Sequence, residues 1–171
     1  MIVWLNGCYG VGKSQVASIL RSRMAHAHVY DPEQVGYFLW DQFPEGMRRT
    51  GDFQDMDIWR SINFDILRHL ARHFEGDVIV PMTLVHPGYF AEIVGRLRAC
   101  GVEVRHFILL ASKDVILQRL SRRGEKRGCW AERQIDRCLA AFEAGLEGVR
   151  IDTSQRSADQ VAQQVLRHMQ P

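Results

Sequence analysis

Long hydrophobic runs are absent from this sequence, and so is a strong net charge of either sign. No apolar run among the 171 residues approaches the roughly 20 residues that a membrane-spanning helix needs. The formal net charge is only +2, which gives no reason to expect a nucleic-acid partner. The first apolar run leads directly into a glycine-rich loop, so we expect no signal peptide and a cytoplasmic protein without a transmembrane segment.

Cysteine is also scarce, and repeats are missing. The four cysteines, at positions 8, 100, 129 and 138, lack the CxxC spacing of zinc sites and are best interpreted as reduced thiols. No internal repeat, low-complexity tract or long linker divides the chain. Its length and its 46% hydrophobic content suffice for a core. We therefore expect one domain over residues 1–171.

The most informative motif lies near the start of the chain. Residues 7–14 read GCYGVGKS, the G-x-x-x-x-G-K-S pattern of a phosphate-binding P-loop. A strand-like run at residues 2–5 precedes it and helical apolar spacing follows it, which makes a chance glycine-rich turn the weaker interpretation. Lys13 would reach the terminal phosphates and Ser14 would coordinate Mg²⁺. The other expected nucleotide contacts in this loop are Gly7, Tyr9, Gly10, Val11 and Gly12.

Asp31 follows the second expected strand, residues 28–30, and has two interpretations. Pro32 and Gln34 after it are signals of a helix start, so Asp31 can be a helix N-cap. The position also lies where parallel α/β sheets open their ligand crevice. There a carboxylate could accept a proton from a substrate hydroxyl or hold a Mg²⁺-bound water. The sequence leaves both roles open.

Candidate acceptor contacts come from the middle of the chain. Residues 36–57 are rich in aromatic side chains without a clean period, which suits a substrate lid, a pocket wall or an irregular packed insertion. A long amphipathic helix is expected from residue 58 to 74, with Trp59 and Arg60 near its start as candidate substrate contacts. Thr83, at the end of the third expected strand (residues 77–83), and His86 after it are further candidates, although a lone histidine there is more often structural.

A basic segment follows the fourth expected strand, residues 104–110, and the helix that Ser112 would cap. It holds seven cations between Arg119 and Arg137, offset in part by three carboxylates. We expect at least two of these arginines to spread the charge of a transferring phosphoryl group, the alternative being a solvated helix face. A last strand, residues 149–153, completes five strand candidates separated by helices, which predicts a parallel sheet with helices on both faces.

Several particular stretches carry a family resemblance. They are IVWLNG before the GKS of the P-loop, YDPE at residues 30–33, VPMT at 80–83, VHP at 85–87 and QIDRC at 134–138. With them, nearly the whole chain resembles the tunicamycin-resistance family of small P-loop kinases, which is related to nucleoside-monophosphate kinases, shikimate kinase and chloramphenicol phosphotransferase. The resemblance implies an α/β P-loop NTPase sandwich, with a five-stranded parallel sheet of order 2-3-1-4-5.

The resemblance also implies ATP and Mg²⁺ as cofactors and a lid, approximately residues 121–133, over the ATP phosphates. An arginine at the position of Arg119 would contact the nucleotide, and Asp152 with Thr153 would line the adenine site. Lid arginines, with Arg123 and Arg133 matching by region only, would reach the phosphates or the substrate. The third strand lacks the terminal aspartate of a conventional magnesium-binding strand, so Mg²⁺ would rest on Ser14, the phosphates, water and Asp31.

These observations predict an ATP-dependent phosphotransferase acting on a hydroxyl of a small molecule, for which the resemblance implies a nucleoside-type antibiotic such as tunicamycin. Lys13, Arg119 and Arg123 would hold the transferred group while Asp31 orients or deprotonates the acceptor. The alternative is an ATP-binding protein that sequesters its ligand without phosphorylating it. A GTPase switch is disfavoured because the N-K-x-D and D-x-x-G motifs are missing. The acceptor, peripheral membrane association and the oligomeric state stay open.

Overall fold

A five-stranded parallel sheet organises the chain, of which the computed structural model describes residues 1–47 and 51–170. The strand order is β2-β3-β1-β4-β5, and every neighbouring pair is parallel. This confirms the predicted fold class and strand order. The strands are β1 (Ile2–Gly7), β2 (Ala27–Val29), β3 (Asp77–Pro81), β4 (Val104–Leu110) and β5 (Val149–Asp152).

The central strand β1 divides the core into two halves, and all six of its residues are buried. Successive side chains of a strand point to opposite faces. Val3 and Leu5 accordingly pack into one apolar cluster, while Ile2 and Trp4 pack into the other. Both faces must therefore be covered by helices, as is usual for parallel sheets.

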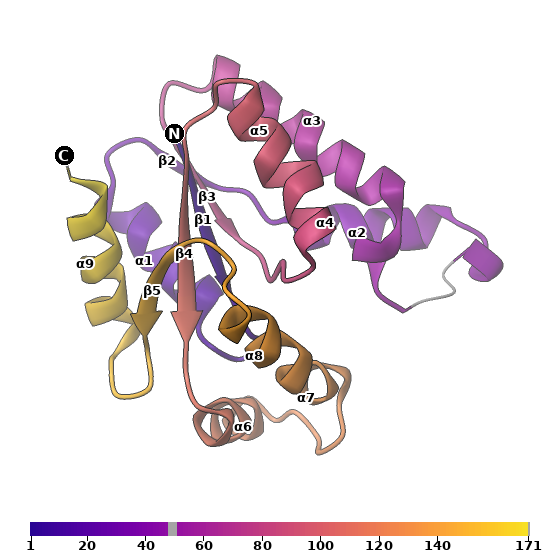
Figure 1. Ribbon diagram of the computed structural model, residues 1–171, viewed down its shortest axis with the longest axis vertical. Coiled ribbons are helices and arrows are strands. Elements are labelled where there is room, and N and C mark those ends of the chain that lie inside the picture. The colour runs from indigo at the N-terminus through magenta and orange to yellow at the C-terminus, as the bar shows by residue number, and fades with distance from the viewer. Residues whose placement is uncertain (48–50, 171) are drawn as a thin grey trace.

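Helices cover the two faces unequally (Figure 1). On one side lie α1 (Lys13–Arg23) and α9 (Ala158–Met169), and on the other lie α3 (Asp57–His73), α4 (Pro87–Phe90) and α5 (Arg96–Ala99). Between α4 and α5 a π-helical segment, η3 (Ala91–Gly95), continues the same helix. Past the carboxyl end of β4 lies α6 (Lys113–Arg122), and α7 (Trp130–Arg133) and α8 (Ile135–Glu143) follow it along the chain.

The segment at residues 36–57 contains more regular structure than its sequence indicates. It begins inside α2 (Pro32–Gln42) and continues with two short 3-10 turns, η1 (Glu45–Met47) and η2 (Phe53–Asp55), with residues 48–50 outside the described part. Only Pro32, Gly36 and Leu39 of α2 are buried. Tyr37 and Phe38 are 50% and 60% exposed, so apolar side chains on the outer face hide the helical period in the sequence.

Small differences in element boundaries have local causes. Strand β3 ends at Pro81, paired with Leu5, rather than at Thr83, and the Met82 amide that follows still donates to the Leu5 carbonyl oxygen at 3.1 Å. The two helices α7 and α8 follow each other directly and meet at Gln134. Within the described residues, no helix is both long enough and apolar enough to cross a bilayer.

Candidate functional site

The P-loop turns sharply from β1 into α1, and Gly12 makes the turn. Gly12 precedes the first helical residue with a φ of 110°, a left-handed conformation that side chains rarely adopt. Lys13 folds back over the loop and is 8% exposed. Its ammonium donates to the carbonyl oxygens of Gly7 (2.9 Å) and Cys8 (3.1 Å) and to the Thr83 hydroxyl (2.7 Å). Burial lowers the pKa of Lys13 to about 8, although nearby Glu33 opposes this shift.

A cationic cavity of about 390 Å³ opens on the α9 side of the P-loop. Arg119 connects the P-loop to the end of β5. It donates to the carbonyl oxygen of Val11 (3.0 Å) and to the hydroxyl (2.9 Å) and carbonyl oxygen (2.6 Å) of Thr153. The expected neighbours Arg119 and Thr153 are thus brought together. The residues lining the cavity are Gly10, Val11, Gly12, Gln15, Val16, Arg119, Arg122, Arg123, Thr153, Arg156, Ala158 and Val161.

Asp152 is next to this cavity in sequence, but its side chain is used locally. One carboxylate oxygen accepts hydrogen bonds from the Ser154 amide (2.9 Å) and hydroxyl (2.7 Å). These bonds hold the pKa of Asp152 below its ordinary value. Asp152 thus shapes the turn that follows β5, while Thr153 lines the cavity, and the adenine-site role of both residues stays a prediction.

A second cavity, of about 300 Å³, lies at the amino end of α1. Lys13, Ser14, Asp31 and Glu33 line it together, and Arg123 reaches it from the end of α6. The exposed Ser14 hydroxyl sits on the first turn of α1, where backbone N–H groups attract anions. This is the arrangement that a phosphate chain carrying Mg²⁺ requires.

Asp31 is the N-cap of α2. One of its carboxylate oxygens accepts from the Glu33 amide (3.0 Å) and the other from the Gln34 side chain (3.1 Å). Both oxygens of Asp31 are therefore engaged by α2, and the capping interpretation is confirmed. Asp31 still lines the second cavity, so its predicted functional role stays a prediction.

Glu33 is the carboxylate that the sequence argument missed. It lines the second cavity and also an adjoining aromatic one. Burial first, and the Asp31 charge second, raise the pKa of Glu33 above its ordinary value. The sequence did contain a signal for Glu33: a helix that starts at Pro32 places Glu33 in its first turn, which like Asp31 lies just past the carboxyl end of β2.

The aromatic cavity, of about 310 Å³, lies between α2, η2 and α7. Gly36 makes it possible: a Cβ atom at this position would lie 2.4 Å from the Phe53 ring. The ring centroid of Phe53 lies 5.2 Å from that of Trp40, and Tyr9 meets Trp130 edge-on at 4.8 Å. The lining residues are Tyr9, Glu33, Tyr37, Trp40, Gly51, Asp52, Phe53 and Trp130.

Two expected substrate contacts at the start of α3 are structural instead. Trp59 is fully buried in the core and donates to the Pro32 carbonyl oxygen at 3.0 Å, which corrects its assignment to the pocket. Arg60 is 9% exposed and pairs with Glu92 at 2.6 Å, while its guanidinium covers the Tyr89 ring at 4.3 Å. The sequence argument failed here because the first turn of α3 faces the core rather than the cavity.

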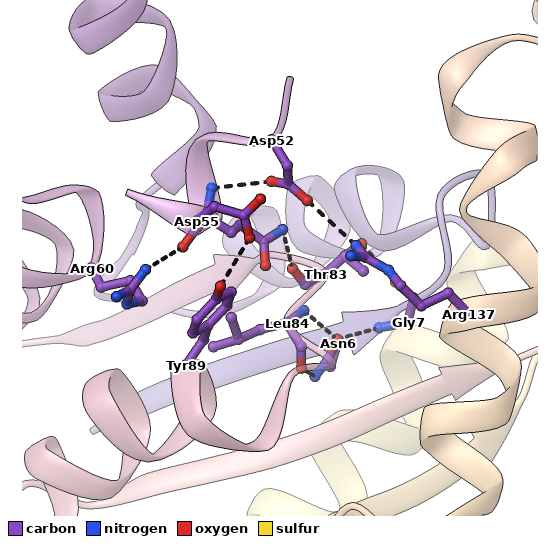
Figure 2. A network of polar contacts seen from close by, with 10 residues as sticks. Asn6, Gly7, Asp52, Asp55, Arg60, Thr83, Leu84, Tyr89 and Arg137 are labelled. Carbon is purple, nitrogen blue, oxygen red and sulfur yellow. Dashed lines mark hydrogen bonds and ion pairs between the residues drawn. The ribbon is translucent and has the colours of Figure 1, made fainter. Parts of the chain in front are cut away.

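The remaining candidates divide in the same way. His86 caps α4 and stacks on Tyr89 at 4.1 Å, which supports its structural interpretation, and in the part of the chain that the structure describes it lines none of the three cavities. Thr83 is 1% exposed and lies behind Lys13. Arg133 is exposed on α7 and is not among the described residues that line the three cavities. Arg137, one turn further along, reaches Asp52 at 3.4 Å instead (Figure 2).

A protein-only metal site is not found among the described residues, where no cluster of three or more histidine, cysteine, aspartate or glutamate side chains could hold a metal ion. This donor set suits Mg²⁺, which is usually held by one or two protein oxygens together with phosphates and water. The Ser14 hydroxyl with the neighbouring carboxylates of Asp31 and Glu33 supplies such oxygens.

Comparison with known proteins agrees with this geometry. The model of a family described as AAA domain matches residues 2–145. The chain belongs to this family. No curated protein matches it.

Among solved structures, the tunicamycin resistance protein of Deinococcus radiodurans aligns with a TM-score of 0.83 and 29% identity over 98% of this chain and 94% of that one. This confirms the family resemblance seen in the sequence. A gluconokinase from Sinorhizobium meliloti 1021 (TM-score 0.68, 15% identity, 96% and 89% covered) shares the fold. So does a shikimate kinase from Acinetobacter baumannii (TM-score 0.64, 17% identity, 98% and 92% covered).

Proposed function

We propose that the protein is an ATP-dependent phosphotransferase that transfers the γ-phosphoryl group to a hydroxyl of a small molecule held in the aromatic cavity. The observation that carries this proposal is the meeting of two cavities at Tyr9 and Glu33, which line both the phosphate-binding cavity and the aromatic one. A donor phosphate and an acceptor ring would thus share one wall, as in-line transfer requires.

The nucleotide would lie along the P-loop with its base toward Arg119 and Thr153. The backbone amides at the start of α1, with the Lys13 ammonium, would hold the phosphates, and Arg123 would approach them from the end of α6. We propose residues 121–133 as the lid, because they join α6 to α7 and carry Arg122 and Arg123 on the cationic cavity. When bound, Mg²⁺ would neutralise charge on the phosphates beside Ser14.

Glu33 is the better candidate for contact with the acceptor hydroxyl. Asp31 has both carboxylate oxygens occupied by α2, whereas Glu33 projects between the cavities and has a raised pKa. A carboxylate whose pKa lies closer to neutrality is a more effective general base near pH 7. Glu33 would orient the hydroxyl and accept its proton as the oxygen–phosphorus bond forms.

The acceptor tested first should be tunicamycin, since a similar structure is that of a tunicamycin resistance protein. The protein is incubated with Mg²⁺, ATP and tunicamycin, and both ADP release and the mass of the product are followed. We expect acceptor-dependent ADP and a product one phosphoryl group heavier. Lys13→Ala should lower the rate at least about a thousandfold. Tight retention of the compound without ADP would instead indicate a sequestering protein.

The role of Glu33 is tested against that of Asp31. Glu33→Gln should lower kcat by about a hundredfold or more and remove the fall in rate on the acid side of the pH profile, while the Kd for ADP stays close to that of the wild type. Asp31→Asn is the matched control, because an asparagine still caps α2. If Asp31→Asn loses the activity and Glu33→Gln keeps it, the two roles are reversed.

A further inference from the structure

A buried chain of hydrogen bonds connects the wall of the aromatic cavity to the P-loop lysine. An ammonium group has three hydrogens to donate, and all three of those on Lys13 have acceptors. Two acceptors are carbonyl oxygens of the P-loop itself, from Gly7 and Cys8. The third is the hydroxyl of Thr83, which is 70 residues away in sequence and makes the shortest of the three bonds, at 2.7 Å.

The Thr83 hydroxyl is itself fixed in orientation. It donates its hydrogen to the Gly7 carbonyl oxygen at 2.8 Å, so a lone pair faces the ammonium of Lys13. Thr83 is 1% exposed, and its chain neighbours Met82 and Leu84 are fully buried. The contact between Lys13 and Thr83 is therefore preorganised. It uses the one hydrogen of the Lys13 ammonium that is not donated to a carbonyl oxygen of the P-loop.

Gln54 holds Thr83 from the acceptor side. Its side-chain amide donates to the Thr83 carbonyl oxygen at 3.1 Å, and its backbone amide donates to Asp52, a residue of the aromatic wall, at 3.0 Å. The Asp52 carboxylate in turn accepts a hydrogen bond from Arg137 of α8 at 3.4 Å. Figure 2 shows this arrangement, with Asp52 above Thr83 and a dashed line from Asp52 to Arg137.

We propose that Thr83 is a positioning residue that holds Lys13 in the nucleotide-free protein, and that Gln54 ties this contact to the aromatic cavity. To bind a phosphate oxygen, the ammonium keeps its two loop carbonyls and exchanges Thr83 for the nucleotide. A stronger Lys13–Thr83 hydrogen bond therefore lowers the affinity for the nucleotide. A change in the wall of the aromatic cavity alters the strength of this bond through Gln54. This rests on the proposed function only in requiring that the P-loop binds a nucleotide.

The experiment measures binding of Mg²⁺·ADP by titration calorimetry at pH 6.5, where the Lys13 ammonium is charged. Thr83→Val keeps the shape of the side chain and removes the acceptor, so ADP should bind about tenfold more tightly. Thr83→Ser restores the hydroxyl and should return the Kd to that of the wild type. A gain in affinity that the serine variant reverses is not an effect of general damage to the core.

Gln54→Met, which removes the amide donor at similar volume, should tighten ADP binding about threefold although Gln54 does not line the nucleotide cavity. Tyr30→Phe is the matched control: it deletes another buried hydrogen bond of the same region, to Asn63 at 2.7 Å, and should leave the Kd unchanged. If Thr83→Val does not fold, Thr83→Cys, with its weak acceptor, should shift the Kd in the same direction.

An unchanged or weaker affinity in folded Thr83→Val or Thr83→Cys would overturn the inference, as would a serine variant that behaves like the valine variant. In both cases the wild type still binds ADP, so the proposed function stands. A wild-type chain that binds no ADP would overturn both.

Discussion

The nucleotide side and the acceptor side of the candidate site are built from different materials. The nucleotide side consists of P-loop backbone and of arginines on α6 and after β5, all fixed to the carboxyl end of the sheet. The acceptor side consists of aromatic rings and carboxylates on α2 and the short turn η2, outside the sheet. Phosphate recognition needs only charge and N–H groups in a set geometry. Recognition of a particular acceptor needs individual side chains, so we expect the specificity of the proposed enzyme to reside in this half.

The largest expected difference between the halves is their response to alkaline pH. The Lys13 pKa of about 8 reflects burial, opposed by Glu33 and reinforced by Arg123. Since the charged ammonium binds phosphate, the affinity for Mg²⁺·ADP should fall by up to about tenfold per pH unit above pH 8. Titration calorimetry between pH 6.5 and 10 measures this.

Lys113→Ala provides the control for that experiment. Lys113 is 50% exposed and pairs with Asp136 away from the cavities, so its loss should leave the alkaline fall in place. An ADP affinity that stays constant to pH 10 would show that the Lys13 ammonium does not bind the nucleotide.

A smaller and one-sided effect is expected from Gly36→Ala. The added methyl group would lie 2.4 Å from the Phe53 ring and must displace it from the acceptor wall. The acceptor KM should rise about tenfold, with a stability loss of about 1–3 kcal/mol, while the Kd for ADP changes by much less than the acceptor KM. Steady-state kinetics with calorimetry separates these effects.

Gly95→Ala is the matched substitution, because the nearest atom to its new Cβ would be a methyl group at an ordinary 3.7 Å. It should change neither constant. If Gly36→Ala weakened ADP binding as much as acceptor binding, the division between the two halves would be wrong.

The sequence predicted the nucleotide half far better than the acceptor half, for a physical reason. The P-loop is a local motif whose glycines and lysine act through backbone geometry, so eight residues suffice to identify it. The strand order followed from the resemblance, and Arg119 with Thr153 came together as implied. The sequence did not reveal that the Asp152 carboxylate closes a turn with Ser154, because no residue spacing encodes that contact.

The acceptor half depends on contacts between distant segments, which single-sequence patterns do not contain. Trp59 was expected to face the cavity, yet the rotation of α3 places it in the core, and Phe53 lines the wall instead. Arg133 was expected to act, but the next turn carries Arg137, which reaches Asp52. Glu33 was missed because Asp31 already accounted for the carboxylate expected after the second strand.

The smallest expected effect concerns the buried contacts of Asn6, in the strand β1 that leads into the P-loop. Asn6 donates to the Leu84 carbonyl oxygen at 2.7 Å and accepts from the Gly7 amide at 2.9 Å, and His106 lies 3.1 Å from its side-chain amide. Burial lowers the pKa of His106 to about 4, despite a backbone partner at Glu147; Arg98 adds to the lowering. The folded protein thus favours neutral His106, whereas the unfolded chain titrates near its ordinary value of 6.5.

This contribution to stability is complete above pH 6.5 and is lost as the pH falls toward 4, with a slope of at most about 1.4 kcal/mol per pH unit. Urea unfolding between pH 7 and 4 measures it, and ADP and acceptor binding should weaken together. His106→Gln should flatten the slope, whereas His26→Gln, at an exposed turn, should not. A slope that His106→Gln leaves intact would assign the acid loss to other groups.

The shared wall at Tyr9 has a consequence for redesign. Tyr9 is a residue of the P-loop, its ring lies 5.3 Å from the Lys13 ammonium, and it also packs on Trp130. Donor and acceptor compartments are therefore not separable modules, because a change at Tyr9 alters both. Mutagenesis aimed at a different acceptor should therefore vary the outer positions of α2, such as Tyr37 and Trp40, and leave Tyr9 unchanged.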